Sequence, residues 1–189
     1  NAGSALSAGG GAGMAMTVTH IAAATASMTW MAIEWMRFGK PSLIGLVTGT
    51  IAGLATVTPA SGYIGPVGGL IVGASAGIVC YYATQYIKQT LKIDDSLDVF
   101  AVHAVGGMLG VLLTSFLAAP AFQGLGLDMS IAAHFGVQLT GIVATVIWAG
   151  VLSFVFLKIV QALVGLRVSE EDETEGLDIT SHGERGYEL

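Results

Sequence analysis

Long apolar stretches alternate with short polar separators along this chain. A helix that crosses about 30 Å of hydrocarbon needs about 20 apolar residues. Five segments approach or exceed that length, at residues 11–36, 42–57, 62–87, 97–119 and 130–163. Proline, glycine and charged residues between these segments favour turns. The pattern predicts an all-α bundle of five membrane-spanning helices, of which the second is short and the fifth is long enough to tilt strongly or project into water.

Small residues recur at every fourth position in two of these segments. The two series are Gly45, Gly49 and Gly53, and Gly69, Gly73 and Gly77. Such spacing lets membrane helices approach one another closely, where dispersion and shape must replace the hydrophobic effect. We therefore expect these glycines to form helix interfaces rather than a ligand site.

The composition agrees with a membrane protein and not with a soluble domain. Of the 189 residues, 53% are hydrophobic and only 11% are charged, whereas soluble domains carry about 25% charged residues. The formal net charge of −6 arises at the C-terminal end, where residues 169–189 contain eight acidic residues and Arg185. We expect a transmembrane domain over 11–168 and an acidic tail over 169–189.

The basic residues predict how the segments are oriented. Lys and Arg in short loops favour the cytoplasmic side. If all five segments cross, the remaining basic residues fall on one side: Arg37, Lys40, Lys88, Lys92, Lys158 and Arg167. This places the N-terminus outside and the acidic tail in the cytoplasm. Nothing near the N-terminus has the pattern of a signal peptide, and we expect the chain to begin partway through a larger protein.

His103 is the main candidate for chemistry, because it lies inside the fourth predicted span. An ionisable residue inside a membrane is costly and by default marks an ion or proton pathway. The alternative is a neutral histidine whose nitrogens bond to carbonyls or a hydroxyl on a neighbouring helix. A neutral imidazole offers one donor and one acceptor, so it could bind a small hydrogen-bonding molecule or relay a proton.

Thr48 lies at the same predicted depth as His103, since each is about 9 Å from the inner end of its helix. The two side chains could face one another across a pore. Alternatively, the Thr48 hydroxyl bonds a carbonyl of its own helix, as is common in membrane helices. His20 could serve as a proton site, but could equally bridge neighbouring helices. His134 lies one turn into the fifth segment, near the outer interface, and is a weaker candidate for function.

Three acidic residues precede His103. Asp94 and Asp95 suit a helix N-terminus, where capping and the helix dipole favour negative charge. Asp98 fits either that role or a functional one; on a regular helix it would point about 140° away from His103.

Several classes of function are not supported. The chain has no nucleophile beside a base, no phosphate-binding loop, and no zinc or EF-hand spacing. Its single cysteine, Cys80, lies in an apolar run, which is typical of a buried, inert thiol. We therefore expect no enzyme activity, metal, cofactor or nucleic-acid partner.

The stretch DDSLDVFAVHAVGGMLG, residues 94–110, closely resembles a signature of ammonium transporters of the Amt/Mep family, relatives of the Rh proteins. Four further motifs resemble the same family in the same order: NAGSA (1–5), GKPSLIG (39–45), AGLATVTPASGYIGPVGG (52–69) and GLRVSEEDETEGLDITSHGE (165–184). The motifs extend over the whole chain, which makes the resemblance specific.

The resemblance implies a homotrimer of eleven-helix subunits, each built from two inverted-topology halves around its own narrow apolar pore. This chain would be the second half, with residues 1–10 at the outer end of the sixth helix; the N-terminal half would be missing. The implied function is ammonium or ammonia transport across the plasma membrane. The alternatives are an ammonium sensor with little flux and a Rh-type neutral ammonia channel.

The resemblance also implies roles for particular residues. His103 corresponds to one of the family's twin mid-pore histidines, and Ser4 to the serine of the outer recruitment site. Thr48 and Asp98 correspond to the inner end of the pore, although some relatives have serine at the position of Thr48. The tail corresponds to a region near the docking surface for a PII-type signalling protein. Thr180 matches a threonine that plant relatives phosphorylate, but an ordinary solvated tail is the alternative.

Overall fold

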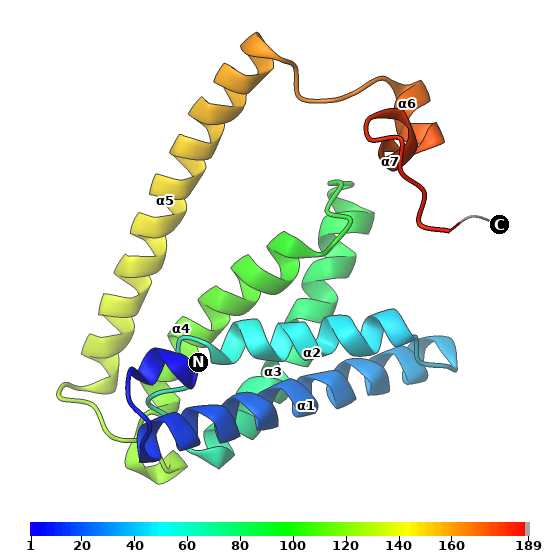
Figure 1. Cartoon of the computed structure of the whole chain (residues 1–189). Coiled ribbons are helices and arrows are strands. Elements are labelled where there is room, and N and C mark those ends of the chain that lie inside the picture. Colours follow the sequence, from blue (N-terminus) through cyan, green and yellow to red (C-terminus); the bar gives the residue numbers. More distant parts are fainter. Residues whose placement is uncertain (188–189) are drawn as a thin grey trace. The chain divides into compact units, whose positions relative to one another are not determined.

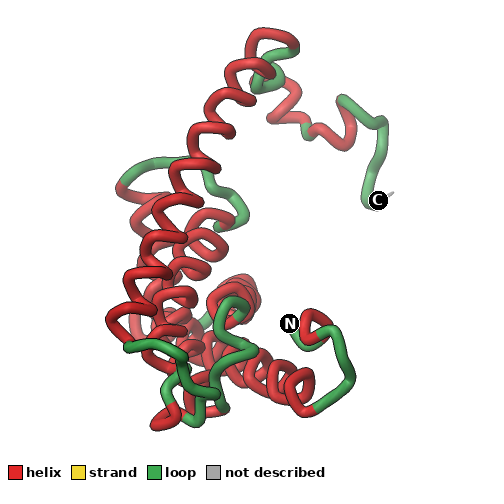
Figure 2. Tube along the Cα trace, turned by 90° about the vertical axis from the view of Figure 1, so that its left-hand side faces the viewer, coloured by secondary structure: helices red, strands yellow, loops and turns green. Residues whose placement is uncertain are grey.

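The computed structural model describes residues 1–187, and every regular element in that range is a helix or helical turn (Figure 2). The chain divides into two compact units, Asn1–Ile142 and Val143–Leu189. The border falls inside the long helix α5, Ile131–Leu163. Each of the five predicted spans contains a helix, and α5 confirms the expectation that the fifth is long.

Three helices form the centre of the first unit: α1 (Gly10–Phe38), α2 (Leu43–Val57) and α3 (Pro66–Gln85). Helix α1 packs against both α2 and α3, and α2 also packs against α3 (Figure 1). Their buried apolar side chains form two clusters, one around Val18, Val57 and Val72 and the other around Trp30, Cys80 and Tyr81. Cys80 is a buried free thiol, as expected.

The glycine series lie at these helix contacts, as their spacing predicted. A Cβ atom built on Gly49 would lie 2.6 Å from the Cβ of Trp30 on α1. A Cβ on Gly73 would lie 2.5 Å from the carbonyl oxygen of Ala22, also on α1. Real side chains do not come so close, so these positions of α2 and α3 have no room for a side chain.

Local chemistry explains where these helices begin and end. Helix α1 ends at Gly39, which adopts the left-handed conformation with φ 75° and so terminates the helix. Helix α2 begins after Ser42, whose hydroxyl accepts a hydrogen bond of 2.9 Å from the backbone N–H of Gly45. Helix α3 begins with Pro66, whose missing N–H costs nothing at that position.

The fourth predicted span contains two kinds of helix. A π-helical segment, η3 (Phe100–Val105), leads into α4 (Gly106–Leu117). A second π-helical segment, η2 (Tyr86–Thr90), extends α3. By length and hydropathy, Pro66–Thr90, Phe100–Leu117 and α5 could each cross a membrane, whereas α2 is apolar but shorter.

Short turns complete the chain. Residues Gly3–Ala5 (η1) and Pro120–Phe122 (η4) form single 3₁₀ turns in the first unit. The second unit contains the end of α5 and two short helices, α6 (Glu170–Glu175) and α7 (Leu177–Thr180). Ser169 caps α6, because its hydroxyl accepts a hydrogen bond of 3.1 Å from the N–H of Asp172.

Candidate functional site

His103 lies in the π-helical segment η3, and its side chain is exposed in this chain. It lines an open cavity of about 530 Å³. The other lining residues are two acids and a set of apolar side chains: Asp94, Asp95, Ile87, Leu91, Ile93, Val99, Phe100 and Ala104. Single π-helical turns inside helices are frequent at functional sites. The imidazole is therefore presented to an apolar hollow that has acids on its wall.

Asp95 anchors the start of the helix that carries His103. Its two carboxylate oxygens accept hydrogen bonds from the backbone N–H groups of Val99 at 2.8 Å and Phe100 at 2.9 Å. These bonds satisfy donors that have no partner within the helix, and they place negative charge at its positive end. The capping role expected for Asp95 is confirmed.

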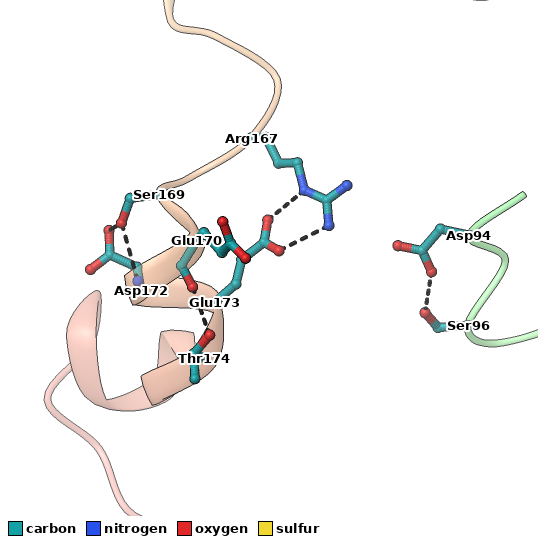
Figure 3. A network of polar contacts seen from close by, with 8 residues as sticks. All are labelled: Asp94, Ser96, Arg167, Ser169, Glu170, Asp172, Glu173 and Thr174. Carbon is teal, nitrogen blue, oxygen red and sulfur yellow. Dashed lines mark hydrogen bonds and ion pairs between the residues drawn. The ribbon is translucent and has the colours of Figure 1, made fainter.

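Asp94 makes a different contact. Its Oδ1 accepts a hydrogen bond of 2.8 Å from the hydroxyl of Ser96, within the loop before η3 (Figure 3). That bond closes a short turn and does not involve a helix N–H. The loop carbonyl of Ser96 in turn accepts a bond of 3.4 Å from Lys88.

Asp98 lies just before the helix that carries His103 and not within it, whereas the sequence analysis had considered a regular helix through both residues. It has φ 57°, just before η3 begins, so the expected angle of about 140° from His103 on a regular helix does not apply. Its carboxylate is buried and forms an ion pair of 2.8 Å with Lys88 from η2. Asp98 thus ties the end of α3 to the start of η3, and it is not among the residues that line the His103 cavity.

Thr48 lies half-buried on α2. The hydroxyls of Thr50 on α2 and of Thr58 at its C-cap donate to the carbonyls of Leu46 and Leu54, at 2.9 and 2.7 Å. Across residues 1–187, no such bond from Thr48 is found. The alternative in which Thr48 bonds its own helix is therefore wrong for this structure. Thr48 does not line the cavity of His103, so the facing arrangement stays a prediction.

Ser4 and Thr180 lie at opposite ends of the chain. Ser4 is exposed in the η1 turn, and nearby the Asn1 amide donates a hydrogen bond of 3.0 Å to Thr19 on α1. Thr180 is exposed at the end of α7, where its hydroxyl donates to the carbonyl of Gly176 at 3.3 Å. In the same unit, Arg167 pairs with Glu173 (Figure 3).

Glu34 forms a polar cluster that sequence reasoning missed. Its carboxylate accepts hydrogen bonds from the N–H of Ser42 at 2.7 Å, the hydroxyl of Ser42 at 3.2 Å and the indole N–H of Trp30 at 3.2 Å. A side chain on Gly45 would collide with this carboxylate. Glu34 therefore holds the start of α2 against α1. The available signal was an acid inside an apolar segment, shortly before a serine cap.

His134 connects two helices and so has a structural role in this chain. Its Nδ1 lies 2.8 Å from the hydroxyl of Ser115 on α4, and its Nε2 lies 3.3 Å from the amide nitrogen of Gln138. If the amide donates to Nε2, the proton of the neutral ring resides on Nδ1 and is donated to Ser115. His20, by contrast, is exposed on α1.

Within residues 1–187, no group of three or more His, Cys, Asp or Glu side chains is arranged to hold a metal ion.

Known proteins match this chain over nearly its full length. The model of the Ammonium Transporter Family matches residues 1–187. An ammonium transporter of Aquifex aeolicus is 41% identical over 190 residues, which cover 100% of this chain and 45% of that protein. The chain thus spans about half the length of the curated relatives it matches.

Solved structures agree with this match. One described as "Sensor Amt Protein" superposes with a TM-score of 0.87 at 30% identity, over 96% of this chain and 44% of that chain. The crystal structure of Candida albicans Mep2 superposes with a TM-score of 0.81 at 32% identity, over 97% of this chain and 43% of that chain.

Proposed function

Because this chain belongs to the ammonium transporter family, we propose that its protein carries ammonium or ammonia across the plasma membrane through a narrow apolar pore. The observation that carries this proposal is His103, within DDSLDVFAVHAVGG, exposed on an apolar cavity. The protein acts as a transporter and not as an enzyme.

The proposed role of His103 follows from the cost of moving charge. An ammonium ion would lose its hydration in an apolar passage, at a cost too large for rapid transport. The ion therefore gives its proton to water at the outer mouth, and neutral ammonia crosses the apolar section. Transport produces a current only if that proton also crosses by a separate route. The imidazole offers one acceptor for an ammonia N–H and one donor for its lone pair. His103 thus replaces water as a hydrogen-bond partner.

Three further residues have proposed places along the pore. Ser4 recruits ammonium at the outer end, where its hydroxyl is exposed. Thr48 lies at the inner end, and its hydroxyl has no acceptor on its own helix, which leaves it able to meet the substrate. Asp98 acts indirectly, because its ion pair with Lys88 fixes the start of the helix that carries His103.

The proposed assembly is a homotrimer in which this chain forms the second inverted half of each subunit. The first half supplies a histidine that faces His103. Helix α5 supports a larger assembly, because none of its residues is buried within this chain. Residues 1–10 lie outside, 11–168 span the membrane, and the tail 169–189 is cytoplasmic. A PII-type signalling protein contacts that face, and Thr180 is a candidate for phosphorylation.

The complete subunit in liposomes provides the test. Ammonium pulses on the wild-type protein should produce a transient current or an internal pH change, and His103→Ala should abolish most of it. His182→Ala is the matched control, because it removes a histidine of the tail and should leave the signal unchanged. Identical traces for wild type and His103→Ala would contradict the pore role.

The same experiment separates the two alternatives. An ammonium sensor would bind ammonium, measured by calorimetry, but would pass little of it into the liposomes. A Rh-type channel would let ammonia through and change the internal pH without an electrical response. Flux with a current supports transport of net charge.

A further inference from the structure

Helix α2 begins with half of a capping box. In a complete box, the hydroxyl of the capping Ser or Thr accepts a bond from the N–H three residues later, and a Glu or Gln at that third position bonds back to the N–H of the capping residue. Ser42 makes the first bond, because its hydroxyl accepts from the N–H of Gly45 at 2.9 Å. Gly45 has no side chain with which to make the second bond. The N–H of Ser42 therefore needs an acceptor from elsewhere.

Glu34 on α1 supplies that acceptor. Its Oε2 accepts a hydrogen bond of 2.7 Å from the N–H of Ser42, as the carboxylate of a capping box would. If a Cβ atom were built on Gly45, its three nearest heavy atoms would all belong to the Glu34 carboxylate. Glu34 thus occupies the space that a side chain at position 45 would fill. The box is completed by the neighbouring helix and not by α2 itself.

This contact ties the end of α1 to the start of α2, which run side by side (Figure 1). Oε1 of Glu34 also accepts bonds of 3.2 Å from the Ser42 hydroxyl and from the indole N–H of Trp30, a buried residue of α1. About one turn later, the hydroxyl of Ser27 on α1 donates to the carbonyl of Leu46 at 3.0 Å. The first turns of α2 are therefore held at a set depth and rotation against α1.

Thr48 follows Ser42 by less than two helical turns. A rigid helix carries any shift or rotation of its first turn along to that position. The next residue, Gly49, packs against Trp30, so the same part of α1 lies beside Thr48. Loss of the Glu34 contact would thus displace the hydroxyl that is proposed for the inner end of the pore.

We propose that Glu34 is a positioning residue for transport, because its carboxylate holds α2 so that Thr48 meets the substrate. The inference rests on the function proposed above for Thr48. Glu34 acts through α2 and does not itself bind ammonium, since both of its oxygens accept bonds from Ser42 and Trp30. A carboxylate at position 45 would cap α2 equally well but would not fix it to α1.

A double-mutant cycle tests whether Glu34 acts through Thr48, with ammonium flux per molecule of the complete subunit in liposomes as the readout. Glu34→Gln leaves one acceptor oxygen for three donors. It should lower flux about tenfold, the equivalent of one charge-assisted hydrogen bond. In a Thr48→Val background, Glu34→Gln should lower flux by less than about twofold, because the two residues are coupled.

Thr50→Val is the matched background for this cycle. The Thr50 hydroxyl bonds its own helix, so Glu34→Gln should keep its full effect there. Equal effects of Glu34→Gln in the wild-type, Thr48→Val and Thr50→Val backgrounds would overturn the positioning role.

Moving the carboxylate separates positioning from capping. Glu34→Ala combined with Gly45→Glu frees the space at position 45 and completes the capping box within α2. Its melting temperature in detergent should be higher than that of Glu34→Ala alone, because the helix start is capped again, whereas flux should stay low. Recovery of flux together with stability would mean that the cap alone suffices, and it would overturn the proposal.

Hydrogen exchange tests the contact without any flux. Glu34→Gln should speed exchange in the first turn of α2 about tenfold, because the N–H of Ser42 loses a charged acceptor; unchanged exchange would overturn the proposal. If Glu34→Gln does not fold, Ser42→Gly replaces it in the cycle, since glycine is tolerated at a helix start. Its smaller loss of flux should likewise depend on Thr48. Absence of flux from the wild type would contradict the proposed function instead, whereas additive losses with normal wild-type flux would contradict this inference alone.

Discussion

At the scale of single residues, His103 and His134 lie in different environments. His134 has partners at both ring nitrogens, from Ser115 and Gln138. His103 is instead exposed on an apolar cavity. Sequence reasoning ranked His103 as the main chemical candidate, because it is ionisable and lies inside a predicted span, and ranked His134 as a weak one. The contact across two helices decides in favour of a structural His134.

The Ser115 hydroxyl should contribute measurably to stability. Ser115→Ala leaves a ring nitrogen of His134 without its partner beside a fully buried position. We expect a loss of about 1–3 kcal/mol in the free energy of unfolding, measured by denaturant titration in detergent. Thr17→Ala is the control, because its exposed hydroxyl bonds only its own helix. Equal losses for the two variants would argue against a special role for the bridge.

At the scale of elements, local sequence patterns predict the helices but do not predict which helices contact one another. Apolar runs, Ser42, Pro66 and Gly39 suffice to explain α1, α2 and α3. The π-helical turn at His103 was not predicted, since hydropathy is the same for both helix types. The Glu34 to Ser42 cluster was missed for another reason: it joins residues of two helices across a turn.

Close packing of α2 on α1 predicts a large effect at Gly49. In Gly49→Ala the new methyl group would meet the Cβ of Trp30 at 2.6 Å and the carbonyl of Ala26 at 3.1 Å. We expect overpacking to cost about 1–3 kcal/mol, seen as a lower melting temperature in detergent. Gly62→Ala, in the exposed turn between α2 and α3, is the control. Nothing lies within 4 Å of its new Cβ, so the melting temperature should be unchanged or higher.

At the scale of the whole molecule, the proposed function depends on family membership and on the orientation of the chain in the membrane. The fold of this chain matches solved Amt and Mep2 structures over nearly its full length. The chain spans about half of each of those proteins, so the pore and the trimer are proposals about a larger assembly. Orientation rests on the basic residues alone, and it can be tested directly.

Cysteine labelling should reveal the orientation, because Cys80 is buried and unreactive toward surface reagents. The complete protein is expressed in cells, with any cysteine outside this chain replaced. Leu125→Cys, at a position 79% exposed, should react with a membrane-impermeant maleimide on intact cells. Ser181→Cys in the tail should react only after permeabilisation. The reverse pattern would invert the proposed topology.

The amino-acid sequence by itself determined the helical, membrane-spanning character, the glycine interfaces, the cap at Asp95 and the family. These properties are local, because hydropathy, spacing and short motifs are read along the chain. Only the tertiary structure decided the pairing of Lys88 with Asp98, the bridge from His134 to Ser115 and the contact of Glu34 with Ser42. Such contacts depend on distances of a few ångströms between helices, and hydropathy does not encode those distances.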